Sequence, residues 1–293
     1  MNETLLAIPL LSPFVEFSFM RRAFAGCLAL SLGATPIGVL LMLRRMSLAG
    51  DAMSHAILPG AAIGYLIAGL SLPAMTLGGL AAGLAVAVLA GGVARNTVIG
   101  EDASLATFYL LSLSTGVLLI SLRGSNVDLL HVLFGSVLAL DDDALLLLAG
   151  FASLSIVALA LAFRLFVLEA SDPAFLNRVS RLGPLAHYGY LVLLVLNLVA
   201  GFHALGTLMA VGIMILPAAA ARLWVGNVGP LLLVAVVVAC CGSLAGLLLS
   251  FYLDLPAGPA IVLTLGAAYL VSLAVGPLGP LAGRWRSHRH FER

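Results

Sequence analysis

Residues 182–221 read LGPLAHYGYLVLLVLNLVAGFHALGTLMAVGIMILPAAAA, a stretch that includes no Asp, Glu or Arg. A helix needs about 20 consecutive apolar residues to cross the roughly 30 Å hydrocarbon core of a bilayer. This stretch is therefore long enough for two crossings. Its interior segment 201–206, GFHALG, is expected to break the helix. The stretch thus predicts two consecutive membrane-spanning helices.

The composition of the whole chain extends this prediction. Of 293 residues, 62% are hydrophobic and 9% are charged, and the mean hydropathy is +1.17. Soluble domains carry roughly 25% charged residues, so this chain has too few of them to cover a soluble surface. The values exclude a soluble enzyme, a nucleic-acid-binding protein, a secreted disulfide scaffold and a disordered regulator. They predict an all-α, polytopic transmembrane helical bundle that forms one domain over residues 1–293.

Charge-free segments divide the chain into expected membrane spans. Nine is the most economical number, and eight or ten would also fit the pattern. Two of the nine are the halves of the long stretch on either side of its break. The other seven are residues 23–43, 47–70, 72–94, 103–122, 144–163, 229–252 and 256–275.

The arginines predict the orientation of these spans. All 14 basic residues are Arg, and cytoplasmic loops of membrane proteins carry the excess of Lys and Arg. With nine spans and the amino terminus outside, all arginines except Arg21, Arg22 and Arg123 lie on the cytoplasmic side. The opposite orientation inverts this split. We therefore expect an external amino terminus and a cytoplasmic tail at about residues 277–293.

The complete absence of Lys limits the chemistry of the chain. A Walker-type phosphate loop needs a Lys to reach the nucleotide phosphates, so any dependence on ATP must come from a partner chain. The formal charge of +1 indicates no attraction to nucleic acid. The three cysteines lie in apolar stretches, where they are expected to pack as small side chains.

One polar pair stands out within the apolar pattern. Asp51 and His55 lie in the segment RRMSLAGDAMSHAILPG at 44–60. A charge inside a bilayer costs at least a few kcal/mol and usually marks a pathway or a partner. The i, i+4 spacing places carboxylate and imidazole on one helix face, and this donor set suits Zn²⁺ or Mn²⁺. Alternatively, Asp51 is an N-cap that satisfies free backbone amides, with His55 merely nearby.

The surroundings of this pair add two expectations. Two donors are too few to close a tetrahedral metal site, so further ligands or a symmetry-related copy are needed. Pro59-Gly60, directly beyond the pair, is expected to kink or interrupt the helix, as in the broken segments that line transport sites. The spacings Gly60/Gly64, Gly79/Gly83 and Gly242/Gly246 predict close helix packing within one subunit.

The run LRRMSLAGDAMSHAILPG at 43–60 resembles the hallmark segment of the zinc/manganese ABC transporter permeases, the membrane subunits of the ABC-3 family. Three further stretches resemble that family in the same order. Residues 127–135 are similar to its central loop, and 172–175 to its cytoplasmic coupling segment. The last stretch, 206–222, resembles its late helix. The resemblance covers roughly residues 20–275.

The resemblance implies a function and a set of partners. It implies the permease subunit of an ATP-driven importer of divalent transition-metal ions, with zinc favoured by the His content and manganese next. Two copies would enclose the ion path, in which Asp51 and His55 are implicated, and no cofactor or catalytic residue is expected. ATPase subunits and an extracytoplasmic metal-binding protein would be the partners, in lipid of a bacterial or archaeal cytoplasmic membrane.

The resemblance also implies a cytoplasmic coupling segment at about 169–183 that docks into the ATPase subunit. A brief amphipathic helix would begin at Asp172-Pro173, and a plain connecting loop is the alternative. Ala174 departs from the family, which often has an acidic residue there. The residues expected to contact the ATPase are Glu169, Asp172, Pro173, Phe175, Leu176 and Val179. Glu101 and Asp102 are likewise expected in a cytoplasmic loop.

Other metal candidates carry less weight. Asp128 and His131 are expected on the external side, near where a metal could enter, with a solvated loop pair as the alternative. His203 lies in the predicted break, where a structural hydrogen bond is the alternative to metal ligation.

Two other classes of protein share some of these features. An ATP-independent secondary cation transporter would also need buried donors but no docking helix. An intramembrane metalloprotease is disfavoured because the sequence has no His-Glu-x-x-His pair.

Overall fold

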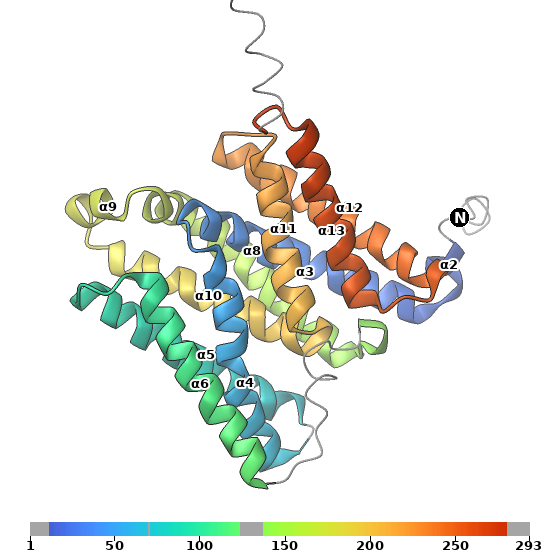
Figure 1. Ribbon diagram of the computed structural model, residues 1–293, viewed down its shortest axis with the longest axis horizontal. Coiled ribbons are helices and arrows are strands. Elements are labelled where there is room, and N and C mark those ends of the chain that lie inside the picture. The colour runs from blue at the N-terminus through green and yellow to red at the C-terminus, as the bar shows by residue number, and fades with distance from the viewer. Residues whose placement is uncertain (1–11, 70, 124–136, 280–293) are drawn as a thin grey trace, which may run out of the picture.

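The computed structural model describes residues 12–69, 71–123 and 137–279, and every regular element in these ranges is helical (Figure 1). The α-helices are α2 (Ser12–Glu16), α3 (Ser18–Leu43), α4 (Ser47–Ala68), α5 (Leu72–Asn96), α6 (Glu101–Arg123), α8 (Asp142–Ser171), α9 (Pro173–Val179), α10 (Gly183–Leu205), α11 (Thr207–Arg222), α12 (Val228–Leu253) and α13 (Ala257–Val275). A 3-10 turn, η1, spans Val137–Ala139. The predicted all-α bundle is confirmed.

Each of the nine expected crossings coincides with a helix in the described ranges: α3, α4, α5, α6, α8, α10, α11, α12 and α13. Seven of these helices are long and apolar enough to cross a membrane. The remaining two are α4 and α11. Helix α4 has 22 residues, but Asp51 and His55 lower its hydropathy, and α11 has only 16 residues. The prediction of a multi-pass helical bundle is therefore confirmed, while the number of nine membrane spans stays a prediction.

The break in the long apolar stretch falls at Gly206, between α10 and α11. Gly206 has a φ of 90°, a backbone conformation that glycine adopts without steric cost. Its N–H donates to the carbonyls of Gly201 and Phe202 at 3.1 and 3.2 Å, which satisfies two carbonyls at the end of α10. The predicted interruption within 201–206 is thus confirmed.

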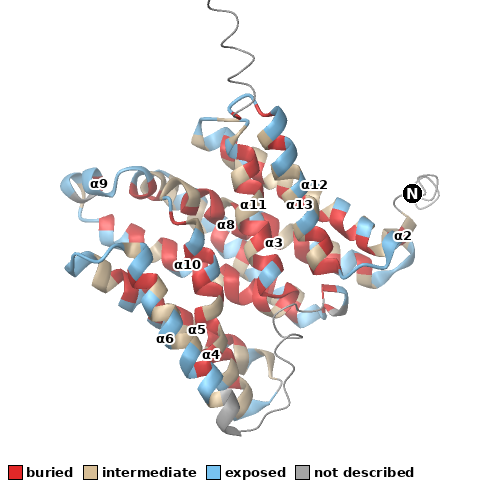
Figure 2. Ribbon diagram, in the orientation of Figure 1, coloured by how far each residue is buried: buried red, intermediate tan, exposed pale blue. Residues whose placement is uncertain are grey.

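Helices α3 and α10 form the centre of the bundle, and their side chains are mostly buried (Figure 2). Helix α3 packs against α8, α11 and α12, while α10 packs against α5 and α8. Helices α4, α5 and α6 pack together as one group, which lies at the lower left of Figure 1. The outer faces of α6, α8 and α13 are largely exposed and apolar, as expected for helices that face lipid.

Close glycine contacts hold α4 against α5. A Cβ atom at Gly60 would overlap the backbone carbonyl of Gly78, and one at Gly78 would overlap that of Gly60. One turn further along, Gly64 touches the backbone of Ala74. Small residues let helix backbones approach where lipid offers no hydrophobic gain for association. The predicted glycine packing is therefore confirmed for this pair of helices.

Three prolines, Pro36, Pro59 and Pro217, lie inside helices without interrupting them. Pro217 of α11 removes the N–H that would bond the carbonyl of Ile213, and the Thr35 hydroxyl of α3 donates to that carbonyl at 3.0 Å. Pro59 lies within α4, which continues to Ala68. The expected interruption of α4 at Pro59 is therefore wrong, while the alternative expectation of a kink there stays a prediction. Neighbouring helices pack against this segment, and Ser112 of α6 donates to the carbonyl of Ala56.

Candidate functional site

The segment that carries Asp51 and His55 becomes helical four residues before Asp51. Helix α4 begins at Ser47, and its N-cap is Met46, which makes no side-chain capping bond. Asp51 therefore lies in the second turn and cannot satisfy the free amides at the helix start. The alternative interpretation of Asp51 as an N-cap is wrong.

Asp51 and His55 form a pair on the outward face of α4. Asp51 Oδ1 lies 3.8 Å from His55 Nε2, and the Asp51 side chain is 61% exposed in the isolated chain. Leu48, one turn earlier on the same face, is 81% exposed. The His55 ring also lies 6.4 Å from the ring of Tyr109 in α6. Asp51 thus points away from the chain's own bundle, whereas His55, at 29% exposed, is partly covered on the side of α6.

One chain supplies too few donors here to enclose a metal ion. Within the described ranges, no group of three or more His, Cys, Asp and Glu side chains is arranged to hold a metal. The pair on α4 offers one carboxylate and one imidazole, while a protein Zn²⁺ site typically has three or four protein ligands. The described part of one chain thus offers two donors at this place, and the ligands that would complete the site stay a prediction.

The other metal candidates lie apart from this pair. Asp128 and His131 fall outside the described residues. His203 lies in the last turn of α10, and its Nδ1 donates to the carbonyl of Val199 at 2.8 Å. This is the structural hydrogen bond expected as the alternative to metal ligation at His203.

The coupling segment forms a short helix, α9, at the end of α8. Asp172 caps it by accepting a hydrogen bond from the Phe175 N–H at 2.8 Å, and Pro173 occupies its first turn, where the missing N–H costs nothing. The predicted helix is confirmed over the plain loop. Phe175 and Val179 are 50% and 68% exposed, so the outer face of α9 is apolar and open.

Two residues expected to face the ATPase are buried instead. Leu176 is buried because α9 packs against α8 and α10 within the same chain. Glu169 lies in the last turn of α8 and its side chain is only 2% exposed. Neither residue is open to a docking partner in the isolated chain, and their assignment to ATPase coupling stays a prediction. Glu169 belongs instead to a group of charged residues that is buried at Glu169, Arg44 and His187 and partly exposed at Arg95 and Glu101.

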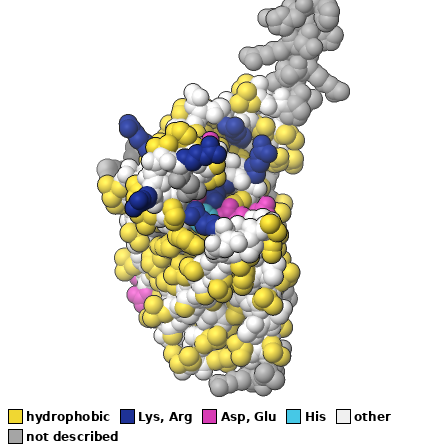
Figure 3. Space-filling model, turned by 90° about the vertical axis from the view of Figure 1, so that its left-hand side faces the viewer, with side chains coloured by type: hydrophobic (Ala, Val, Ile, Leu, Met, Phe, Trp, Pro, Cys, Tyr) yellow, Lys and Arg dark blue, Asp and Glu magenta, His cyan; other side chains and the backbone are white. Residues whose placement is uncertain are grey.

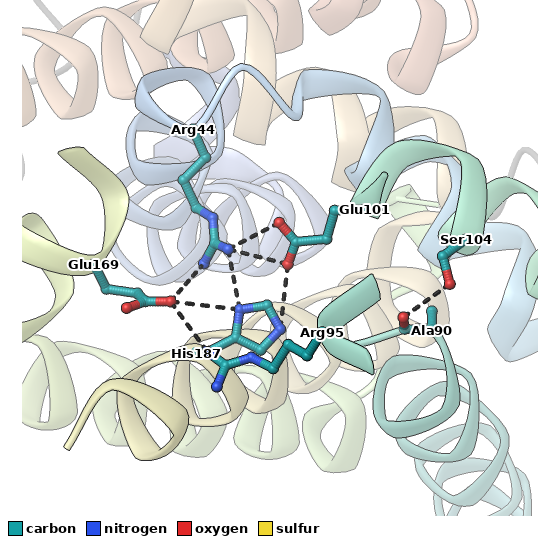
Figure 4. A network of polar contacts seen from close by, with 7 residues as sticks. All are labelled: Arg44, Ala90, Arg95, Glu101, Ser104, Glu169 and His187. Atoms are coloured by element: carbon teal, nitrogen blue, oxygen red, sulfur yellow. Dashed lines mark hydrogen bonds and ion pairs between the residues drawn. The ribbon is translucent and has the colours of Figure 1, made fainter. Parts of the chain in front are cut away.

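That group, which we call the junction network, consists of Arg44, Arg95, Glu101, Glu169 and His187 (Figure 4). The residues come from the ends of α3, α5 and α8 and the starts of α6 and α10. Arg44 Nη2 donates to both carboxylate oxygens of Glu101 at 3.0 Å and lies 3.0 Å from His187 Nδ1. Five helix termini are thus joined by charges on one side of the bundle.

Glu169 completes the junction network through longer contacts. Its Oε1 lies 3.4 Å from Arg95 Nη2, 3.6 Å from His187 Nδ1 and 4.0 Å from Arg44 Nη1. The network therefore pairs two guanidinium groups with two carboxylates around one imidazole. This balance of charge is what burial of ionised groups requires.

Aromatic rings and a hydroxyl support the junction network. The Arg44 guanidinium lies 5.1 Å from the ring centre of Tyr190, and that of Arg95 lies 5.7 Å from Tyr188, both within the range of cation–π attraction. The buried Ser104 hydroxyl donates to the carbonyl of Ala90 at 2.8 Å and ties the start of α6 to α5. Glu101, expected in a loop, is the first residue of α6.

Sequence reasoning missed the junction network as a unit, and it did not single out His187. The sequence did contain a signal that could have indicated such a network. Arg44, Arg95, Glu101 and Glu169 each flank an apolar segment at the end that the predicted topology places on the cytoplasmic side. What could not be predicted is which of these charges meet, because that depends on the neighbours of each helix.

The fold and the site together define a class of protein. It is a multi-pass helical bundle that presents an acid–imidazole pair on one helix and a short exposed helix at its Arg-rich end, the features expected of a membrane transport subunit. The family model described as the ABC 3 transport family matches residues 16–276. The chain belongs to this family, which confirms the resemblance seen in its sequence.

Relatives of known name match most of the chain. The manganese import system permease protein ScaB of Streptococcus parasanguinis is 30% identical over 89% of this chain and 92% of its own length. A probable iron transport system membrane protein of Haemophilus influenzae is 30% identical over 90% of this chain and 96% of its own length. The structure of PsaBC from Streptococcus pneumoniae in complex with Fab matches with a TM-score of 0.81 at 27% identity, covering 94% of this chain and 99% of that chain.

These matches confirm the coarse part of the sequence-based assignment. The chain is a membrane permease of a metal ABC transporter and not an enzyme. An intramembrane protease is thereby excluded. The nature of the ion, the ligands and the assembly go beyond what family membership decides.

Proposed function

We propose that this chain forms the ion path of an ATP-driven importer of divalent transition-metal ions, with Asp51 and His55 as ligands of the ion in transit. The observation that carries the proposal is the outward position of this acid–imidazole pair in the second turn of α4. A carboxylate that faces lipid carries a large desolvation cost. The face must therefore meet water, an ion or another protein surface.

A second copy of the chain is the proposed cover for this face. Two copies related by a two-fold axis would bring two Asp51 and two His55 side chains together and double the donor number. The exposed Leu48, one turn before Asp51, would bury its apolar surface in the same contact. A set of four donors would be enough for a transition-metal ion that must also be released.

Manganese is the first ion to test, followed by iron and zinc. Relatives over most of the chain are named for manganese import and for iron transport. The preference for zinc taken from the His content finds no support in these relatives. One carboxylate with one imidazole per chain also suits Mn²⁺, which accepts oxygen ligands readily.

We further propose that the membrane holds nine spans, with the amino terminus outside. Arg side chains gather over the upper part of the face seen in Figure 3, and hydrophobic side chains cover most of the area below. The junction network places the termini of five helices on one side, as alternating crossings require. The Arg excess supports a cytoplasmic position for that side.

The proposed partners follow from this orientation. The exposed apolar face of α9, formed by Phe175 and Val179, would dock into an ATPase subunit, and the chain itself has no Lys for a phosphate loop. An extracytoplasmic metal-binding protein would deliver the ion in a bacterial cytoplasmic membrane. An ATP-independent cation transporter is not favoured, because it would have no use for an exposed docking helix.

The test is ion uptake by the complete transporter in lipid vesicles. Vesicles that contain this chain, its ATPase subunit and the binding protein are supplied with Mn²⁺, Fe²⁺ or Zn²⁺ and ATP. We expect ATP-dependent uptake, and we expect Asp51→Ala and His55→Ala each to reduce it to background. Asp143→Asn, an exposed acid in the first turn of α8, serves as the control and should leave uptake unchanged. Uptake at the unmutated level in both α4 variants would remove the pair from the path.

A further inference from the structure

The junction network lies where two functional segments begin. Arg44 is the C-cap of α3, three residues before the first residue of α4. Glu169 lies in the last turn of α8, and α9 begins at Pro173. The contact between Arg44 and Glu169 thus joins the start of the helix that carries Asp51 and His55 to the base of the helix proposed to dock into the ATPase.

A tight, hydrogen-bonded turn connects Arg44 to α4. Arg45 has a φ of 60°, a left-handed backbone conformation that is uncommon in residues other than glycine. Backbone hydrogen bonds from Arg44 to Leu40, from Arg45 to Met42 and from Met46 to Leu41 close this turn at 2.9–3.1 Å. A displacement of Arg44 must therefore move the first turns of α4 as well.

A kink separates the end of α8 from the rest of that helix. Ala162 has non-helical backbone angles (φ −108°, ψ 19°), which divide α8 by a kink. Glu169 and α9 follow this kink on the same terminal segment. A force applied to α9 would therefore act on Glu169 before it acts on the long apolar part of α8.

Arg44 makes a short contact with Glu101 and a long contact with Glu169 in the junction network. Arg44 holds Glu101 by two hydrogen bonds of 3.0 Å, whereas its closest approach to Glu169 is an ion pair of 4.0 Å. Within the described part of the chain, Arg44 Nη1 and Glu169 Oε2 are buried without a hydrogen-bond partner. Buried groups of this kind gain most from a rearrangement that pairs them, so a second arrangement lies within a small movement of Glu169.

His187 lies between the two carboxylates, Glu101 and Glu169. Its Nδ1 lies 3.0 Å from Arg44 Nη2, and its Nε2, which makes no hydrogen bond within the described residues, lies 3.2 Å from Glu101 Oε1. Buried ion pairs add little net stability, and a registry or switch role is their best-attested use.

We propose that Arg44, Glu169 and His187 are coupling residues, which transmit a displacement of α9 to the start of α4 and so to Asp51 and His55. This inference rests on the proposed function. When the terminal segment of α8 is displaced, Glu169 forms a hydrogen bond with Arg44. The resulting displacement of Arg44 also displaces the turn between α3 and α4. Coupling between distant sites needs such an element with two discrete arrangements.

The experiment separates ATP hydrolysis from transport. Glu169→Gln keeps the shape of the side chain and removes its charge. In vesicles with the complete transporter, we expect ATP hydrolysis to continue, while Mn²⁺ taken up per ATP hydrolysed falls about tenfold, a typical size of coupling between two sites. Asp142→Asn is the matched control, since it breaks the exposed Arg22–Asp142 ion pair at the opposite ends of α3 and α8, and it should change neither rate.

A second readout distinguishes coupling from a structural role. Hydrogen exchange of the amides at 47–51 is measured in the complete transporter with and without nucleotide. We expect nucleotide to change this exchange in the unmutated protein and not in Glu169→Gln, while α9 stays protected by the ATPase in both. An unchanged ratio of uptake to hydrolysis, or an intact nucleotide response of α4 in Glu169→Gln, would overturn the proposal.

Two further variants keep the outcomes separate. Should Glu169→Gln fail to assemble, Arg95→Gln replaces it, because Arg95 contacts Glu169 and leaves the Arg44–Glu101 pair intact. A smaller fall in the same ratio is then expected, and no fall would overturn the coupling role. Asp51→Ala is measured alongside. His55→Ala is measured with it, and uptake at the unmutated level in both α4 variants would reject their proposed role in the ion path. Loss of uptake in both, with normal coupling in Glu169→Gln, would reject only this inference.

Discussion

The two polar regions of this chain lie in opposite surroundings. The Asp51–His55 pair is open to the outside of the chain, with its carboxylate 61% exposed and its two side chains 3.8 Å apart. The junction network is enclosed by five helix ends, with Arg44 and Glu169 only 8% and 2% exposed. Among the described residues, the first region has no further His, Cys, Asp or Glu arranged with it to hold a metal, and the second pairs its two guanidinium groups with two carboxylates.

This difference indicates a division of roles. A group that must bind and release an ion needs open coordination positions, so it is found where its own chain leaves it uncovered. A group that sets the relative position of helices needs partners that burial strengthens, since charges attract more strongly at low dielectric. Burial and pairing, rather than charge alone, separate the two roles in this protein.

The largest effect on stability is expected at the buried region. Glu169→Ala leaves Arg44 and Arg95 without their shared carboxylate, and removal of one partner from a buried ion pair costs about 3–5 kcal/mol. Thermal unfolding of the purified protein in detergent should show a clear fall in midpoint. A midpoint equal to that of the unmutated protein would mean that the junction network is not buried in the membrane-embedded chain.

A smaller effect is expected on the packed face of α4, opposite the exposed pair. Gly60→Ala puts a methyl group into the backbone of α5 at Gly78, and overpacking of this kind costs about 1–3 kcal/mol. The same unfolding measurement applies. Gly266→Ala is the control, because nothing lies within 4 Å of a Cβ atom there, and equal behaviour of the two variants would contradict the close contact of α4 and α5.

The smallest effect on stability is expected at the exposed pair. Asp51→Asn removes a charge from a side chain with few contacts of its own, so the free energy of unfolding of the isolated chain should change by less than about 0.5 kcal/mol. Its Mn²⁺ uptake should nevertheless be lost. A strong loss of stability in detergent, equal to that of Glu169→Ala, would abolish the contrast between the two regions.

Much of the fold was predictable because apolar segments in a membrane have few choices. Without water to satisfy the backbone, each long apolar segment must form a helix, and the arrangement of the expected spans follows directly. The break at Gly206 and the capped helix after Asp172 were equally readable, since each depends on neighbouring residues in the chain. Features that depend only on residues close together in the sequence could therefore be predicted from the sequence.

The sequence by itself determined that the chain is a helical membrane bundle, that it carries an acid–imidazole pair at i, i+4, and which family it resembles. Only the tertiary structure decided that Asp51 faces outward, that Glu169 and Leu176 are buried, and that His187 joins Arg44 and Glu101. The physical reason is that helix formation and helix-face spacing depend on residues within a few positions of each other. Burial and charge pairing depend on which helices are neighbours, and residues such as Arg44 and His187 lie far apart in the chain.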